Sequence, residues 1–121
     1  MKTILLVEDD PFLIDIYSRQ LQKEGFKVDI AVDGQMALDK ITNTYPDLLL
    51  LDLMLPKMNG WEVLKKARIN PKSKNVKVVI ISNLDQREYA DAIKDLEVLK
   101  YFLKISTTPK EIAEAIKEIL K

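Results

Sequence analysis

Acidic side chains follow two apolar runs of the sequence, at positions where they could meet. Asp52 ends the run Leu48-Leu49-Leu50-Leu51, and Glu8 and Asp9 follow the run Ile4-Leu5-Leu6-Val7. Continuous apolar runs of this kind are typical of strands that are buried on both faces of a parallel sheet. Open α/β folds place their ligand sites at the C-terminal edge of such a sheet. Because clustered carboxylates repel each other unless a cation lies between them, the pattern favours a hard metal ion and phosphate chemistry.

The acidic triplet Glu8-Asp9-Asp10 has two interpretations. All three could be ordinary solvated acids or caps, because acids are common in the first turn of a helix. Alternatively, Glu8 and Asp9 lie nearest the sheet edge, while Asp10 before Pro11 is better explained as a helix N-cap. Together with Asp52, the first two acids would suit a magnesium ion, which takes oxygen ligands and keeps several waters.

Two further strand ends carry groups that fit phosphate chemistry. Ser82 ends a fourth apolar run and Lys104 ends a short fifth one. Taken alone, a hydroxyl at a strand end is most often a turn residue, and a lysine is usually a solvated charge. In a cleft with three acids and a transferred phosphoryl group, Lys104 would be a fixed cation on a phosphoryl oxygen. Suitable polar groups at four strand ends of one sheet edge are a more specific signal of phosphate chemistry than any one of these residues.

Strand and helix signals alternate five times along the chain. Strands are predicted at residues 3–7, 27–32, 47–52, 76–82 and 101–103. Helices are predicted at about 11–24, between Asp33-Gly34 and Tyr45-Pro46, at 60–69, at about 85–96, and from Thr108 onward. Repeated strand–helix units with right-handed crossovers give a doubly wound parallel sheet with helices on both faces, an α/β fold.

Length and composition limit the classes of function. The 121 residues, 47% of them apolar, suit one domain over residues 1–121 with one core. Cysteine and histidine are both absent, which excludes disulfides, thiolate or imidazole metal sites and histidine catalysis. The balance of 19 basic and 19 acidic residues gives no sign of direct nucleic-acid binding. With no signal peptide and no apolar run near the roughly 20 residues that span a bilayer, we expect a cytoplasmic protein without a membrane segment.

The sequence resembles the receiver domain of two-component response regulators, the CheY-like superfamily. The resemblance covers the whole chain and is carried by the segments Leu6–Asp10, Asp47–Gly60, Val78–Ser82 and Tyr101–Lys104. It implies a flavodoxin-like, five-stranded sheet of order 2-1-3-4-5. It also implies a signalling switch that catalyses only its own phosphotransfer and dephosphorylation and is not otherwise an enzyme. Because the fifth predicted helix ends the chain, we expect no output domain.

The resemblance assigns roles to individual residues. It implies that Asp52 accepts a phosphoryl group from a sensor histidine kinase or a phosphotransfer protein. It implies that Glu8, Asp9, Asp52 and the backbone carbonyl of Met54 hold Mg²⁺. It makes Ser82 and Lys104 the phosphoryl contacts.

Tyr101 matches the aromatic residue that the family uses as a rotameric switch, although half-burial for packing is the commoner fate of a strand tyrosine. A downstream protein or a second copy of the chain would bind to the face formed by the fourth helix, the fifth strand and the fifth helix.

Three features depart from the family pattern. Asn83 follows the switch hydroxyl, where a small residue is usual, and Ile105 follows the lysine, where proline is usual; residues 96–100 contain no glycine. A cis bond before a non-proline residue costs roughly 2.5–4 kcal/mol, so we expect a trans Lys104–Ile105 bond and a shifted loop. The departures fall in the switching half of the domain, whereas the phosphorylation half matches.

Other functions compete with the phosphoaccepting receiver. The departures leave open a pseudo-receiver, an interaction module that keeps the fold without switching. A phosphohydrolase of the haloacid dehalogenase type needs a second acid two residues after its nucleophile, where this chain has Met54. A flavodoxin is disfavoured because the acids after the first strand would repel a flavin phosphate. The phosphoaccepting receiver remains the favoured interpretation.

Overall fold

The computed structural model describes residues 1–121, in which five strands alternate with five α-helices. The strands are β1 (Thr3–Val7), β2 (Lys27–Ala31), β3 (Leu48–Asp52), β4 (Lys77–Ser82) and β5 (Lys100–Leu103). The helices are α1 (Pro11–Lys23), α2 (Gly34–Thr44), α3 (Gly60–Ile69), α4 (Ala90–Asp95) and α5 (Pro109–Ile119), with 3₁₀ turns η1 (Gln86–Tyr89) and η2 (Lys104–Ser106). All strand pairs are parallel and the order is β2-β1-β3-β4-β5. The doubly wound sheet and its predicted strand order are confirmed.

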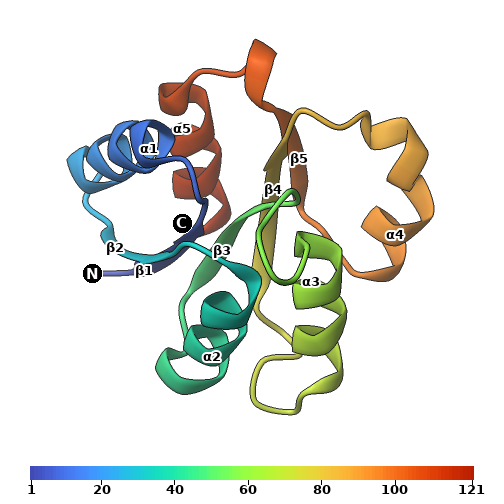
Figure 1. The fold of residues 1–121 in the computed structure, drawn as a ribbon. Coiled ribbons are helices and arrows are strands. Elements are labelled where there is room, and N and C mark those ends of the chain that lie inside the picture. Colours follow the sequence, from blue (N-terminus) through green and yellow to red (C-terminus); the bar gives the residue numbers. More distant parts are fainter.

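The helices form a layer on each face of the sheet (Figure 1). Helices α1 and α5 pack on one face, and α2 and α3 pack on the other, with α4 beside the β4–β5 end. Two apolar clusters result, one on each face of the sheet. Right-handed crossovers produce this arrangement whenever strand order reverses at a central strand.

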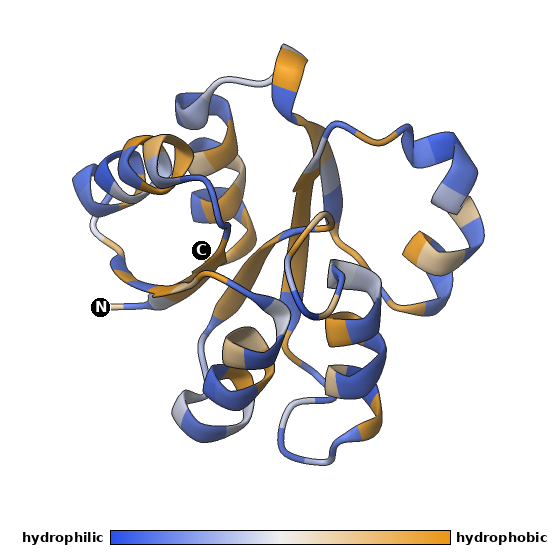
Figure 2. Ribbon diagram, in the orientation of Figure 1, coloured by the Kyte–Doolittle hydropathy of each residue, from blue (hydrophilic) through white to orange (hydrophobic).

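The leucine run of β3 explains why the strand lies at the centre. Leu48 and Leu50 face the α1–α5 layer, while Leu49 and Leu51 face the α2–α3 layer, and all four have no exposed surface. Each fully buried leucine contributes roughly 1.5–3 kcal/mol relative to an exposed one. In Figure 2 the central strands are orange along most of their length, whereas the helices alternate between orange and blue. Asp52 is therefore carried by the most deeply buried strand of the sheet.

Capping side chains begin the helices that follow β1, β2, β3 and η2. Asp10 accepts hydrogen bonds from the amides of Phe12 and Leu13, at 2.9 and 3.4 Å, as its predicted N-cap role requires. Equivalent bonds are accepted by Asp33 for α2, Asn59 for α3 and Thr108 for α5. A cap satisfies amide groups that have no partner within the helix. The chain can thus reverse sharply just after each strand end.

The segment predicted as a helix at about 85–96 differs in the structure. It begins as the 3₁₀ turn η1 and becomes α-helical only over the six residues of α4, and neither element has a fully buried side chain. Asp85 caps the amide of Arg87 and pairs with its guanidinium at 2.7 Å, which favours a tight first turn. Elsewhere the predicted boundaries agree with those of the structure or differ by one residue. No helix has the length and apolar character needed to cross a bilayer.

Candidate functional site

Four strand ends meet at the C-terminal edge of the sheet. In the register of the strands, Val7 lies beside Leu51, so Glu8 and Asp52 follow neighbouring residues. Ser82 is the last residue of β4 and lies beside Leu103, so Lys104 comes one residue later. The four polar groups therefore lie at the C-terminal edge of the sheet, as predicted.

Three carboxylates form a compact cluster at this edge. Glu8, Asp9 and Asp52 each offer one oxygen, and these oxygens lie within 4.8 Å of one another. Glu8 and Asp52 are buried, with 1% and 4% of their surface exposed, whereas Asp9 is exposed. A cluster of hard oxygen atoms that opens to solvent on one side fits a magnesium ion, which needs carboxylates on one side and water on the other.

Lys104 connects the two buried acids. Its ammonium donates a hydrogen bond to Asp52 Oδ2 at 3.0 Å and lies 2.7 Å from Glu8 Oε1. The second contact is an ion pair outside hydrogen-bond geometry, so Glu8 Oε1 has no hydrogen-bond donor. One ammonium faces three carboxylates, and a divalent cation would balance the remaining charge. Both the chemistry of the oxygen atoms and the incompletely satisfied Glu8 therefore fit Mg²⁺.

Burial sets the protonation equilibria of the pair Glu8 and Lys104. Desolvation raises the pKa of Glu8 above its ordinary value, and the neighbouring Lys104 ammonium offsets this only in part. For Lys104, desolvation alone would lower the pKa, but the neighbouring Glu8 and Asp52 outweigh it and raise the pKa above its ordinary value. Lys104 is therefore a fixed positive charge at neutral pH.

The loop 53–59 places the backbone beside Asp52. Asp52 Oδ1 accepts a hydrogen bond from the amide of Met54 at 3.3 Å, and the Met54 side chain is 63% exposed. The Met54 carbonyl as a metal ligand stays a prediction, since this contact fixes only the start of the loop. A Cβ atom on Gly34 would overlap the carbonyl of Met58, so the first residue of α2 packs directly against the backbone of the loop. Sequence reasoning treated Gly34 only as part of a turn and missed this support; the signal was the Asp-Gly pair itself.

Ser82 and Tyr101 meet at Leu84. The buried hydroxyl of Ser82 accepts a hydrogen bond from the amide of Leu84 at 3.1 Å, and the Tyr101 hydroxyl donates to the Leu84 carbonyl at 2.8 Å. Tyr101 is half-buried against the α2–α3 cluster, and burial raises the pKa of its phenol. The predicted switch residues are thus coupled through one residue of the loop after β4.

The residues that depart from the family pattern also meet. Asn83 Oδ1 accepts a hydrogen bond from the amide of Ile105 at 3.1 Å. No peptide bond is cis, so the trans Lys104–Ile105 bond is as expected.

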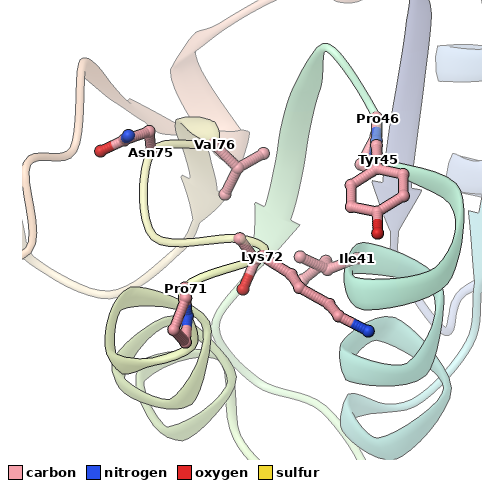
Figure 3. Close-up of a pocket in the computed structure, with 8 residues that line it drawn as sticks. Ile41, Tyr45, Pro46, Pro71, Lys72, Asn75 and Val76 are labelled. Carbon is pink, nitrogen blue, oxygen red and sulfur yellow. The ribbon is translucent and has the colours of Figure 1, made fainter.

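A hollow at the opposite edge of the sheet contains none of the predicted site residues (Figure 3). It is lined by Ile41, Tyr45, Pro46, Pro71, Lys72, Ser73, Asn75 and Val76. No carboxylate lines it, and the Ser73 hydroxyl already donates to the carbonyl of Ala67 at 2.8 Å. The predicted site residues therefore lie together at the C-terminal edge of the sheet and not in this hollow.

Comparison with known sequences agrees with this geometry. The sequence model of the response regulator receiver domain matches residues 4–117. Sporulation initiation phosphotransferase F of Bacillus subtilis is 33% identical over 121 residues, a match that covers 99% of this chain and 95% of that protein. The DNA-binding transcriptional regulator RpaA of Synechocystis is 36% identical over 86 residues, which cover 71% of this chain but only 36% of the regulator.

Solved structures of response regulators share the fold of this chain. A CheY-like response regulator receiver domain protein from Methanospirillum hungatei superposes with a TM-score of 0.89 at 32% identity, covering 99% of this chain and 94% of that one. A chemotaxis response regulator of Vibrio cholerae, at 24% identity and a TM-score of 0.88, covers 98% of both chains and shares the fold.

Proposed function

The chain belongs to the response regulator receiver domain family, and on this premise we propose that it accepts a phosphoryl group on Asp52 and responds by changing its partner-binding surface. The observation that carries the proposal is the position of Lys104 between Glu8 and Asp52. A buried carboxylate beside a fixed cation, at the C-terminal end of a central strand, is suited to attack phosphorus and to carry the added charge.

The transfer moves one phosphoryl group between two atoms. A carboxylate oxygen of Asp52 forms a bond to phosphorus while the bond from phosphorus to the donor nitrogen of a phosphohistidine breaks, and that nitrogen keeps the electron pair. Lys104 stabilises the negative charge on the phosphoryl oxygens through its ammonium. Glu8, Asp9, Asp52 and the Met54 carbonyl would hold Mg²⁺, which when bound supplies further charge stabilisation to the phosphoryl oxygens.

Ser82 is suited to sense the new group. Its oxygen accepts from the Leu84 amide, so its own hydrogen stays available to donate to a phosphoryl oxygen. A move of Ser82 toward Asp52 would carry Leu84 with it and disturb the hydrogen bond from Tyr101. In this way a local change at the acid cluster reaches β5.

The partners follow from the same chemistry. The donor is a sensor histidine kinase or a phosphotransfer protein, and the cytoplasm is where such donors obtain phosphoryl groups from ATP. The similarity to sporulation initiation phosphotransferase F of Bacillus subtilis supports phosphoryl transfer. A downstream protein or a second copy of the chain would bind the face formed by α4, β5 and α5.

Intact-mass measurement after incubation with acetyl phosphate and Mg²⁺ tests the proposal. The protein should gain the mass of one phosphoryl group, and Asp52→Asn should gain none. Asp91→Asn, at an exposed acid of α4, is the matched control and should be labelled like the unchanged protein. Equal labelling of Asp52→Asn would contradict the assignment. Labelling of Asp52 without any change at the α4–β5–α5 face would identify a pseudo-receiver.

A further inference from the structure

Asn83 joins the two loops that carry the proposed phosphoryl contacts. Its Oδ1 accepts from the amide of Ile105 at 3.1 Å, and it follows Ser82 just as Ile105 follows Lys104. The backbone pairing of β4 with β5 ends at Ser82 and Leu103. The Asn83 side chain therefore adds one more bond beyond the end of the backbone ladder.

No other hydrogen bond connects these two loops. The hydrogen bonds between backbone groups outside helices and strands include none from residues 83–85 to residues 104–107. A hollow lies beside the Asn83–Ile105 bond, lined by Asn83, Asp85, Gln86, Arg87, Leu103 and Ile105. Asn83 is exposed and Ile105 is 82% exposed, so burial does not hold the loops together either. The Asn83–Ile105 bond is thus the one hydrogen bond that joins residues 83–85 to residues 104–107 beyond the end of the backbone ladder.

The two unusual residues complement each other chemically. A proline at position 105 would have no amide hydrogen, and an alanine at position 83 would have no side-chain acceptor. The bond needs an acceptor oxygen on the side chain at position 83 and an amide hydrogen at position 105, and this chain has both. Considered separately, each residue weakens the match to the switching half of the family pattern. Together they form a hydrogen bond between the two loops, where the family usually has a small residue and a proline.

Both ends of the connection are already anchored at the site. The Lys104 ammonium is held by Glu8 and Asp52, while the loop after Ser82 is held through Leu84 by the Tyr101 hydroxyl. With the Asn83–Ile105 bond between them, the loop that carries the Lys104 ammonium and the loop that follows the Ser82 hydroxyl are joined before any phosphoryl group arrives. Groups that are held in place before reaction bind a transition state or its mimic more tightly than groups that must first be ordered.

We propose that Asn83 is a positioning residue, which holds the Lys104 loop at the spacing from Ser82 at which both groups converge on the phosphoryl group of Asp52. The inference rests on the proposed function. Asn83 makes no hydrogen bond to the acids or to Lys104, and it acts through the Ile105 amide.

Calorimetric titration with beryllofluoride in saturating Mg²⁺, and with Mg²⁺ alone, tests the inference. Asn83→Ala should weaken beryllofluoride binding roughly fivefold, the effect of losing one hydrogen bond. Its affinity for Mg²⁺ should stay unchanged, because Glu8, Asp9 and Asp52 are untouched. A general loss of structure would weaken both. Asn83→Asp, which keeps an acceptor oxygen, should retain most of the affinity for beryllofluoride.

A double-mutant cycle identifies the bond itself. Ile105→Pro removes the donor and should weaken beryllofluoride binding as Asn83→Ala does, while Ile105→Ala keeps the amide and should bind like the unchanged protein. The variant with both Asn83→Ala and Ile105→Pro should lose no more than either single variant. Additive losses, or unchanged binding by Asn83→Ala, would overturn the inference. If the unchanged protein itself failed to bind beryllofluoride, the proposed function and this inference with it would be wrong.

Discussion

Gly60 packs directly against the backbone of Asp52: a Cβ atom at Gly60 would lie 2.6 Å from the Asp52 carbonyl oxygen. The Gly60 amide also donates to the carbonyl of Leu53 at 2.9 Å, so the first residue of α3 closes the loop 53–59 onto the end of β3. The absence of a side chain at position 60 is therefore a condition for the geometry of the proposed phosphoacceptor.

We expect Gly60→Ala to impair phosphorylation. The added methyl group must displace the backbone of residues 52–53, and overpacking of this kind costs roughly 1–3 kcal/mol. Because Asp52 would move relative to Lys104, labelling by acetyl phosphate should slow as well. Thermal unfolding and the initial rate of mass gain measure the two effects.

Gly25→Ala is the matched control for this change. Gly25 has a φ of +93°, which strains any other residue, but it lies at the opposite edge of the sheet. It should lower the melting temperature without slowing labelling of the folded protein. If the two variants slowed labelling equally, the contact between Gly60 and Asp52 would not be the cause.

The elements of the fold were predictable because their signals are local. The run at residues 48–51 needs burial on both faces, and Asp10-Pro11 marks a helix start whatever surrounds it. The segment 85–96 was predicted as one helix, and the prediction was wrong for its first turn. The pairing of Arg87 with Asp85 and the absence of any fully buried side chain decide the conformation there, and neither is visible in periodicity.

The candidate site was predictable only in part. Parallel strands bring their C-terminal ends to one edge, so the neighbourhood of Glu8, Asp52, Ser82 and Lys104 followed from the strand order. The ion pairs of Lys104 and the Asn83–Ile105 bond depend on side-chain directions that spacing does not encode. The contacts of Gly34 with Met58 and of Gly60 with Asp52 depend on the folded path of the loop 53–59, which residue spacing does not encode.

Magnesium should stabilise the protein through Asp9 and not through Asp10. Asp9 belongs to the carboxylate cluster, whereas Asp10 Oδ1 is occupied by the amides of Phe12 and Leu13. Asp9→Ala should remove most of the rise in melting temperature that Mg²⁺ causes by binding to the folded state. Asp10→Ala should cost about 1 kcal/mol of stability and keep that rise. The reverse result would show that the two acids have exchanged roles.

The phosphoryl group should be lost slowly by hydrolysis. Met54 and Leu84 lie two residues after Asp52 and Ser82, and neither side chain can orient a water molecule by hydrogen bonding. Met54→Asn combined with Leu84→Glu should speed the decay of phosphorylated protein, followed by mass after removal of acetyl phosphate. Ile69→Asn, at an 82% exposed residue of α3, is the control and should leave the decay unchanged. Equal lifetimes in all three proteins would contradict the role of the two apolar residues.

The ion pair of Asp29 with Lys40 should make stability depend on pH in the acid range. The Lys40 ammonium, 2.8 Å from Asp29 Oδ1, holds the pKa of Asp29 below its ordinary value of 3.8. A lowered pKa means that the stabilisation is present above pH 3.8 and is lost as the pH falls through the value in the folded protein. Both side chains are about a third exposed, so the effect should stay below about 1 kcal/mol.

Urea unfolding of the unchanged protein and of Asp29→Asn from pH 7 to pH 2 measures this dependence. The difference in unfolding free energy should be constant at neutral pH and shrink below pH 3.8. Asn43→Ala, at an exposed and uncharged residue of α2, should show no such convergence. A difference that persisted at the lowest pH would indicate that packing of the substituted amide side chain, and not the lost charge, is responsible.

Phosphorylation should change the conformation or dynamics of residues 85–105. Neither η1 nor α4 has a fully buried side chain, so this part of the molecule is held by few contacts and opens at low cost. A displacement of Ser82 would reach it through Leu84 and Tyr101. Tyr89 of η1 also contacts Trp61 of α3, with ring centroids 5.2 Å apart, so Trp61 borders this part of the molecule. A phosphoryl mimic can shift this equilibrium only by its differential affinity for the two states.

Amide hydrogen exchange with and without beryllofluoride measures the response, and the fluorescence of Trp61, the one tryptophan of the chain, reports on the contact with Tyr89. Exchange in residues 85–105 and the emission of Trp61 should both change on addition of the mimic, and Asp52→Asn should show neither change. Tyr101→Phe keeps the ring but loses the hydrogen bond to Leu84, so its exchange in residues 85–105 should be faster before the mimic is added. Changes confined to the loops around Asp52, with residues 85–105 silent, would instead support a pseudo-receiver that takes up the phosphoryl group without transmitting a signal.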